Sequence, residues 1–265
     1  MTGIGFYRDE ALPFFELKLC QEYGVAYKKH AHEEYSLGLV VAGGSSFWCE
    51  GGHEDIAPQT MLLLPPGCMH ACKPVESGCW NYRMLFVAAD WVQALAAERP
   101  GTIWTQPILK TVSPRAVQRL ERRLQRLQGT ETPLAKEAVL IDLFDGLQQG
   151  DKKMWLQRPG EERPRLKQVK EYLQNHFAAK VTLEELGAVS GLNKFHLLRL
   201  FKKAFKIPPH MYQMVLRINF AKRELGKRKE PAEVAQEAGF YDQSHFSKTF
   251  KSYTGITPEK YQKGS

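Results

Sequence analysis

Long hydrophobic runs are absent from this chain of 265 residues. A helix that crosses a membrane needs roughly 18 or more consecutive apolar residues, and the longest apolar runs here, MLLLPP and SLGLVV, have only the length of a strand. The opening residues, MTGIGFYRDE, contain no basic region followed by an apolar one. We therefore expect neither a membrane contact nor a secretory signal.

Cysteine is scarce and unevenly placed. The chain contains five cysteines, an odd number, and all of them fall within the first 79 residues. Their spacing is not that of a small secreted domain held together by disulfides. This pattern favours a reducing compartment, so we expect a cytoplasmic protein.

Net positive charge is absent from the first 160 residues, which contain 17 Lys and Arg against 18 Asp and Glu. Residues 161–265 contain 20 and 11, so they carry the whole net charge of +8. This asymmetry predicts a polyanionic partner for the C-terminal part alone. The length allows two domains, and 43% hydrophobic residues are typical of globular proteins.

Helical periodicity is absent from about the first 105 residues, where short apolar runs alternate with turns. The runs are rich in β-branched, aromatic and aliphatic residues and cover 17–19, 35–41, 46–49 and 61–64. Glycine pairs and the sequence Pro65-Pro66-Gly67 separate them. The pattern predicts a small β-barrel or sandwich over residues 1–112.

A helical pair is predicted over residues 113–149, because Ser113 and Pro114 form a helix start and apolar residues then recur every three or four positions. The pair packs on the barrel in one interpretation. In the other, its first helix forms the seam of a homodimer through Val117, Leu120, Leu124 and Leu127. Residues 150–164 are polar and contain Gly and Pro, which indicates a linker before residues 165–265.

An internal repeat dominates the C-terminal part: residues 190–213 recur, 49 positions later, at 239–262. His196 aligns with His245, and aromatic, proline and basic positions align as well. Each copy contains two short helices joined by a turn with glycine, at about 183–205 and 231–253. This is the helix-turn-helix arrangement. Capping residues mark its helix starts: Thr182 with Glu185, Asn193, Pro231 and Asp242.

The second helix of each copy has one apolar and one polar or basic face. We expect the apolar face in the core, with Leu197, Leu200, Phe201 and Ala204 in the first copy and Phe246, Phe250 and Tyr253 in the second. The outward face contains Lys194, Phe195, Leu198, Arg199 and Lys202 in the first copy, and Gln243, Ser244, Ser247, Lys248 and Lys251 in the second.

Duplication has a physical purpose if the partner is double-stranded DNA. Two rigidly joined helix-turn-helix units can reach successive major-groove segments about 34 Å apart on one face of the duplex. A long helix predicted at 209–225 lies between the copies and could hold them in fixed relation. An ordinary three-helix bundle would share the periodicity, but it would not explain the repeated basic surface positions.

The motifs VAQEAGF, DQSHFSKTFK and GITPEKY resemble the DNA-binding domain of the AraC/XylS family of transcription regulators. The resemblance covers about 100 residues and implies sequence-specific DNA binding, transcription regulation and RNA polymerase as a candidate partner. By position, it assigns DNA contacts to the outward residues of both helices. The sequence departs from the family in three places: Gly187 replaces the usual Ala, Leu198 is apolar, and Lys248 replaces Arg.

Histidines in the N-terminal part follow the spacings Gly24-x5-His30-x-His32 and Pro65-x-Gly67-x2-His70. These spacings resemble the two motifs of the cupin barrel, which implies a cupin-like effector domain. In metal cupins a carboxylate completes the ligand set, but here Ser36 or Leu37 occupies that position. Three interpretations remain open: His30, His32 and His70 bind a divalent metal, line an effector pocket, or only make local hydrogen bonds.

Aromatic and polar residues on or near predicted strands are further candidates for an effector pocket: Trp48, Trp80, Tyr82 and Arg83. The sequence Cys68-x-His70-x-Cys72 adds soft-metal or thiol chemistry as a minor option. We therefore predict a transcription regulator controlled by a small-molecule effector, without catalytic residues or a required cofactor. The alternative is a metal-dependent cupin enzyme or a metal- or redox-sensing regulator that uses the three histidines.

Overall fold

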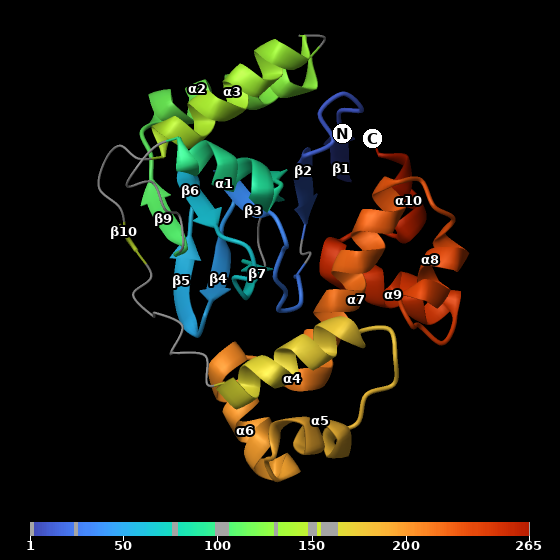
Figure 1. The fold of residues 1–265 in the computed structure, drawn as a ribbon. Helices are drawn as coiled ribbons and strands as arrows, with labels where there is room; N and C mark the ends of the chain where they lie inside the picture. The colour runs from blue at the N-terminus through green and yellow to red at the C-terminus, as the bar shows by residue number, and fades with distance from the viewer. Residues whose placement is uncertain are drawn as a thin grey trace.

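The protein folds into an N-terminal β-domain with helices on one side and a C-terminal domain made of helices (Figure 1). The structure, a computed structural model, describes residues 3–23, 26–75, 79–98, 106–129, 132–147, 153–154 and 164–264. None of the helices in this described part combines the length and the hydrophobicity that a bilayer crossing requires.

Two sheets form the β-domain. The larger has seven strands in the order β1-β2-β8-β3-β6-β9-β10, and the smaller has three in the order β5-β4-β7. All the neighbouring strands of both sheets pair antiparallel. The strands are β1 (Gly3–Arg8), β2 (Phe15–Tyr23), β3 (Tyr35–Ala42), β4 (Ser45–Cys49), β5 (Gly52–Ile56), β6 (Thr60–Leu64), β7 (His70–Pro74), β8 (Cys79–Val87), β9 (Ile108–Thr111) and β10 (Lys153–Met154).

The central strands of the large sheet are apolar on both faces. Leu37 and Leu39 of β3 belong to the core beneath the helices, whereas Val40 belongs to the core between the two sheets. In β6, Leu63 likewise belongs to the core beneath the helices, and Leu62 belongs to the core between the sheets. Side chains alternate between the faces of a strand, so a strand covered on both sides is a continuous apolar run. This explains the runs SLGLVV and MLLL.

Three helices cover one face of the large sheet: α1 (Ala89–Ala97), α2 (Pro114–Gln128) and α3 (Pro133–Gly146). Ser113 caps α2, as predicted, and accepts a hydrogen bond from the backbone N–H of Ala116. The expectation of strands alone up to about residue 105 is wrong for α1, because this helix follows β8 directly. Its apolar residues, such as Val92, pack into the same core as the sheet.

The apolar seam of α2 packs against its own β-domain. Leu124 and Leu127 are 5% and 0% exposed, and the partly buried Val117 and Leu120 lie against the same core. The interpretation of these four residues as a dimer seam is therefore wrong for Leu124 and Leu127, whose side chains are already enclosed. A homodimer itself stays a prediction.

The predicted linker, residues 150–164, lies mostly outside the described residues. Lys153 and Met154 form β10, which pairs with β9, and Pro164 begins α4 (Pro164–Asn175). The remaining helices are α5 (Leu183–Ser190), α6 (Lys194–Phe205), α7 (Pro209–Gly226), α8 (Pro231–Glu237), α9 (Gln243–Thr254) and α10 (Pro258–Lys263). The order of domains thus agrees with the fold class that the sequence predicts.

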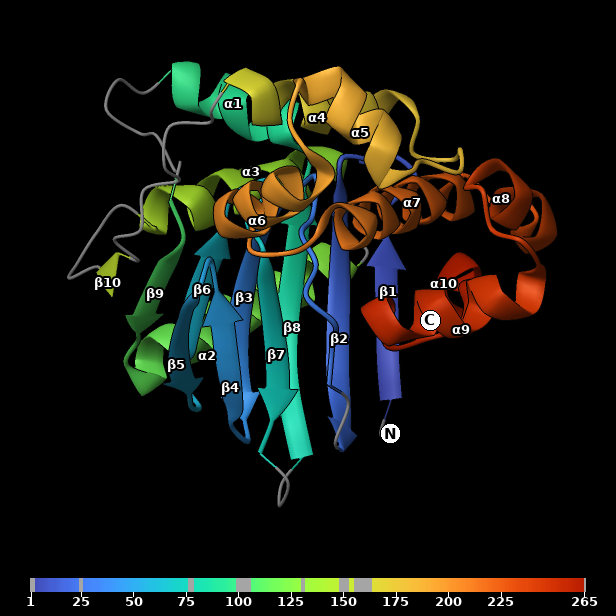
Figure 2. The ribbon, with the colours of Figure 1, turned by 90° about the horizontal axis from the view of Figure 1, so that it is seen from below.

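The two helix-turn-helix units begin where their capping residues predict. Thr182 and Glu185 form a complete capping box at the start of α5, and Asn193 and Asp242 cap α6 and α9. The first unit, α4–α6, has a core of its own. The second unit, α8–α10, shares a core with α7 and with the β-domain. Figures 1 and 2 show α9 and α10 beside the edge strand β1 and its neighbour β2.

Candidate functional site

A cavity lies where the β-domain meets α7 and the second unit. Its volume is about 60 Å³. The β-domain contributes basic, aromatic and histidine side chains, which are described below. The C-terminal domain contributes Val215, Ile218, Asn219 and Lys222 of α7, Tyr253 and Thr254 of α9, and Tyr261 of α10.

Two buried lysines line this cavity, one from each domain. Lys18 is 7% exposed, and its amino group donates to the Tyr27 hydroxyl at 3.2 Å and to the Thr254 carbonyl at 3.0 Å. Burial lowers the pKa of Lys18 to about 8, and the nearby charge of Lys222 acts in the same direction. Lys222 is 8% exposed and lies 3.6 Å from the Glu34 carboxylate. Two partly desolvated amino groups make the cavity suitable for an anion.

Three histidines also line the cavity. The ring centroids of His30 and His70 are 4.3 Å apart, and His32 lies 4.8 Å from His30 and 5.0 Å from His70. Burial lowers the pKa of all three, to about 4 for His70, and neighbouring His and Lys charges add to the effect. The imidazoles are therefore neutral at neutral pH.

The structure brings most of the residues that the sequence analysis proposes for an effector pocket to this one cavity. His30, His32, His70, Trp80, Tyr82 and Arg83 all line the cavity. Trp48 does not line the cavity. It is 8% exposed and belongs to the core that joins the domains, and the Lys29 amino group lies 3.6 Å from its ring centroid. This cation–π contact accounts for Trp48 without a ligand.

Lys18 and Lys222 were missed by the sequence analysis. Lys18 alternates with Leu17 and Leu19 along β2, which is the pattern of a strand with one solvated face. In the fold, the C-terminal domain covers that face. Lys222 lies on a helix rich in basic residues, so no local signal distinguishes it from a solvated lysine.

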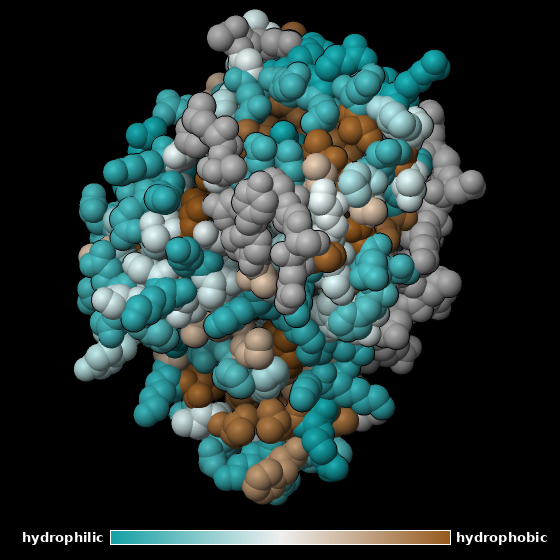
Figure 3. Space-filling model, turned by 180° about the vertical axis from the view of Figure 1, so that it is seen from behind, coloured by the Kyte–Doolittle hydropathy of each residue, from teal (hydrophilic) through white to brown (hydrophobic). Residues whose placement is uncertain are grey.

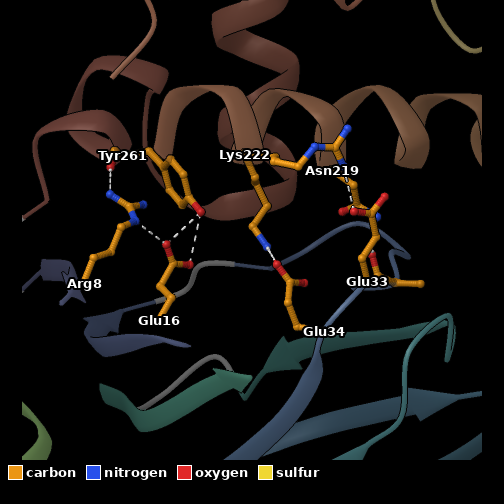
Figure 4. A network of polar contacts seen from close by, with 9 residues as sticks. Arg8, Glu16, Glu33, Glu34, Asn219, Lys222 and Tyr261 are labelled. Atoms are coloured by element: carbon orange, nitrogen blue, oxygen red, sulfur yellow. Dashed lines mark hydrogen bonds and ion pairs between the residues drawn. The ribbon is translucent and has the colours of Figure 1, made fainter. Parts of the chain in front are cut away.

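A polar network joins the two domains beside the cavity (Figure 4). The Tyr261 hydroxyl lies 2.9 Å from a Glu16 carboxylate oxygen, which also forms a 2.6 Å ion pair with Arg8. The Arg8 guanidinium donates to the backbone carbonyl of Tyr261 at 2.9 Å and lies 4.3 Å from its ring centroid. Strands β1 and β2 thus hold α10 through one buried side chain.

Residues directly after the first histidine pair hold α7 against the β-domain. Arg223 forms a 2.9 Å ion pair with Glu33, and Asn219 donates to the Ala31 carbonyl at 3.2 Å. Glu34 pairs with Lys222, as described above. The two carboxylates closest in sequence to His32 are therefore engaged with α7 (Figure 4).

The second helix of each unit presents the expected outward face. Arg199, Lys202, Gln243, Ser244, Lys248 and Lys251 are exposed, and Lys194, Leu198 and Ser247 are partly exposed. Phe195 is 68% exposed. The lower end of the molecule in Figure 3, which the first unit forms, shows apolar surface among hydrophilic side chains. None of these ten residues belongs to a hydrophobic core among the described residues.

The inward faces agree with prediction at all positions but one. Leu197, Phe201, Phe246 and Phe250 are fully buried. Ala204, expected in the core, is exposed instead. Phe205, the next residue, packs its ring 4.4 Å from that of Phe201 and covers the position.

Arg217 on α7 fixes the relation between the two units. Its guanidinium donates to the Phe177 carbonyl at 2.8 Å, to the Ala179 carbonyl at 3.0 Å, and to the Gly239 carbonyl in the second turn. Gly239 has a φ of 77°, and a Cβ there would lie 1.9 Å from the Ala178 carbonyl oxygen. Only glycine fits this contact, so the long helix between the copies ties the loop between α4 and α5 to the turn of the second unit.

Comparisons with known proteins agree with this architecture. Residues 20–144 match the AraC-like ligand binding domain, and residues 186–264 match a helix-turn-helix domain. The uncharacterized HTH-type transcriptional regulator YbfI of Bacillus subtilis is 31% identical over 83% of this chain and 81% of its own length. The probable transcriptional regulator LumQ of Photobacterium leiognathi is 36% identical over 34% of this chain and 37% of its own.

Solved structures show the same fold at low identity. ToxT from Vibrio cholerae O395 superposes with a TM-score of 0.61 at 10% identity, over 94% of this chain and 97% of its own. Wild-type ToxT from Vibrio cholerae strain SCE256 with a bound unsaturated fatty acid superposes with a TM-score of 0.61 at 12% identity, over 99% of this chain and 96% of its own. The superpositions confirm the predicted fold class, and the family and relative matches confirm the predicted transcription regulator. The chain belongs to the AraC family of helix-turn-helix transcription regulators, with an AraC-like ligand-binding domain before its DNA-binding domain.

Proposed function

We propose that this regulator responds to a small effector that has an anionic group and an apolar body and binds in the cavity between the domains. The observation that carries the proposal is the lining: Lys18 and Lys222 supply buried positive charge from opposite domains, and aromatic and aliphatic side chains supply most of the remaining wall. The fatty acid bound to ToxT, which has the same fold, combines these two chemistries in one molecule. The present volume suits a compact acid; a longer chain requires the domains to separate.

Effector binding would act through the contact between the domains. A ligand that touches both the β-domain and α7 stabilises the arrangement in which these surfaces meet. Because Arg217 connects α7 to the loop before α5 and to the turn before α9, a change at this contact would reach both units. The effector would thereby alter which DNA sites the regulator binds, and transcription with RNA polymerase at such a promoter is the output.

The DNA contacts in this proposal come from the outward faces of α6 and α9. Arg199 is exposed and is suited to a bidentate contact with guanine, whereas Lys248 is suited to a phosphate. Leu198 is suited to the methyl group of thymine. The two helices would read separate major-groove segments of one site.

Site selection from a random DNA pool with the full chain tests the DNA part. We expect two short sequence blocks about one helical turn apart and binding that weakens steeply with salt. In fluorescence anisotropy, Arg199→Ala should weaken binding to the selected site by about 1–3 kcal/mol and should weaken binding to scrambled DNA much less. Lys73→Ala, an exposed lysine on β7, serves as control. Equal losses on both DNAs would contradict base reading by Arg199.

A panel of carboxylic acids and matching alcohols tests the effector part by thermal shift. Benzoate and straight-chain acids of increasing length should raise the melting temperature, and the alcohols should have much smaller effects. Lys18→Met and Lys222→Met should abolish the difference between acid and alcohol, while Lys73→Met should keep it. A panel in which acids and alcohols act alike would overturn the anionic effector. Sedimentation of the full chain tests the homodimer separately.

A further inference from the structure

The three histidines form a cluster with the composition of a metal site. Their ligating nitrogen atoms all lie within 4.8 Å of one another, at the β-domain end of the cavity. We propose that His30, His32 and His70 bind one divalent transition metal ion. This site lies beyond the DNA-binding function and the proposed effector.

Hydrogen bonds at the other ring nitrogens leave two lone pairs free for the metal. The Nδ1 of His30 is 2.6 Å from the Lys28 carbonyl oxygen, and the Nδ1 of His70 is 3.0 Å from that of Cys68. A carbonyl oxygen only accepts, so each Nδ1 carries the proton and each Nε2 keeps a lone pair. Metal-bound histidines almost always show this arrangement, because the carbonyl fixes the tautomer and the ring orientation.

The third histidine has an unsatisfied nitrogen. The Nδ1 of His32 is buried and has no hydrogen-bond partner, which costs free energy in a protein interior. A metal ligand bond at His32 would remove this cost. The backbones of His30 and His70 are joined by reciprocal N–H to carbonyl bonds of 2.9 Å and 2.8 Å, so a β-bridge to the start of β7 fixes the positions of two of the three rings.

The type of metal follows from the donor set. Imidazole nitrogens suit zinc, copper, nickel and iron, and are poor ligands for magnesium or calcium. Tetrahedral zinc bonds of 2.0–2.1 Å place ligand atoms about 3.4 Å apart. The ligand atoms here lie within 4.8 Å of one another, so metal binding requires the rings to move closer together by up to about 1.4 Å. Glu33 and Glu34 are engaged with α7, and the protein therefore supplies three ligands.

The remaining coordination positions face the cavity that contains Lys18 and Lys222. A dication next to two lysines is stabilised by an anion that offsets the positive charge. We infer that the anionic group of the effector is the fourth ligand. This fourth ligand rests on the proposed function, whereas the three-histidine site does not. When bound, the metal supplies a Lewis-acidic position for that group, while the two lysines orient and neutralise it.

Cobalt(II) titration of the full chain, after treatment with a chelator, tests the site without an effector. We expect one Co²⁺ per chain, visible d–d absorption bands and displacement by Zn²⁺. His30→Ala and His70→Ala should abolish the bands, while His53→Ala, an exposed histidine on β5, should leave them unchanged. If the first two variants fail to fold by circular dichroism, His32→Gln decides, because its Nδ1 has no protein partner to lose. Absence of a stoichiometric site in the wild-type chain would overturn the inference.

Benzoate added to the Co²⁺ form tests the fourth ligand. We expect the bands to shift and each ligand to tighten the other at least tenfold, by the same factor in both directions. Lys18→Met should reduce this coupling and retain the Co²⁺ site. Benzoate that binds without shifting the bands would overturn the fourth ligand and keep the effector proposal, whereas a chain that binds benzoate but no Co²⁺ would overturn the metal alone.

Discussion

The two helix-turn-helix units are copies in sequence but have different surroundings. The first unit packs around a core of its own, with Leu197 and Phe201 at its centre. In the second unit, Phe246 and Phe250 share a core with Phe6 and Phe86 of the β-domain. One copy is therefore a separate module, while the other is part of the contact between the domains.

This difference shows where regulation can enter. The cavity is lined by α7, α9 and α10, and none of its lining residues comes from α4–α6. The hydrogen bonds and ion pairs described between the β-domain and the C-terminal domain likewise come from α7 and the segments after it, as at Lys18, Glu16 and Glu33. A ligand would thus act first on the second unit, and the first would respond through α7.

Removal of a core phenylalanine from either unit should give the largest effect. Phe201→Ala and Phe250→Ala each truncate a fully buried ring and should cost about 3–5 kcal/mol. Hydrogen exchange should distinguish the two variants. Phe201→Ala should raise exchange in α4–α6, whereas Phe250→Ala should raise it in α8–α10 and also in β1 and β2. The same spread of exchange for both variants would contradict the shared core.

Lys18→Met removes a buried link to the second unit and should change how stability depends on pH. In the folded protein the pKa of Lys18 is about 8, below its value of about 10.4 in an unfolded chain. Between these values the unfolded state binds more protons, so the wild-type free energy of unfolding rises with pH. We expect a gain of up to about 3 kcal/mol relative to the variant between pH 7 and pH 10.5.

Urea unfolding at several pH values measures this difference. Lys73→Met, at an exposed position on β7, should follow the wild-type curve. Parallel curves for wild type and Lys18→Met would mean that Lys18 is hydrated in the folded protein, and would weaken the argument that the cavity attracts anions.

The sequence predicted the units well because their signals are local. Helix starts depend on neighbouring residues, and the caps at Thr182, Asn193 and Asp242 all formed as expected. The histidine cluster could also be predicted from the sequence, because His30 and His32 are two residues apart and the spacing Pro65-x-Gly67-x2-His70 identified the third histidine. The cavity was only partly predictable: Lys18 and Lys222 are 204 positions apart, and only tertiary packing brings them to one cavity and moves Trp48 out of it.

Tyr261→Phe tests the polar half of the contact and should have a smaller effect. It removes the hydroxyl that lies 2.9 Å from Glu16 and leaves that partly buried carboxylate with one partner fewer. We expect a loss of about 1–2 kcal/mol and faster exchange in α10. Tyr253→Phe, on the adjacent α9, should lower the free energy of unfolding less, because Tyr253 contributes to stability through the packing of its ring. Equal losses would show that the Glu16 contact adds nothing to burial of the ring.

The turns of the two units differ by one residue, which predicts the smallest effect. Between the turn glycine and the cap, the first unit has only Leu192, whereas the second has two residues, Phe240 and Tyr241. Gly187 and Ala235 occupy equivalent places, since their carbonyls accept the N–H groups of Leu192 and Phe240. A Cβ on Gly187 would lie 3.0 Å from the Leu192 carbonyl oxygen.

Gly187→Ala should therefore behave differently from an ordinary helical substitution. Alanine gains about 1 kcal/mol over glycine in a helix interior, but the short turn leaves the Leu192 carbonyl little room to move. We expect the crowding to cancel this gain and leave a net loss of about 0.5 kcal/mol. Ala235→Gly in the longer turn should lose about 1 kcal/mol. Thermal unfolding measures both, and a stabilising Gly187→Ala would show that the first turn yields to the added methyl group.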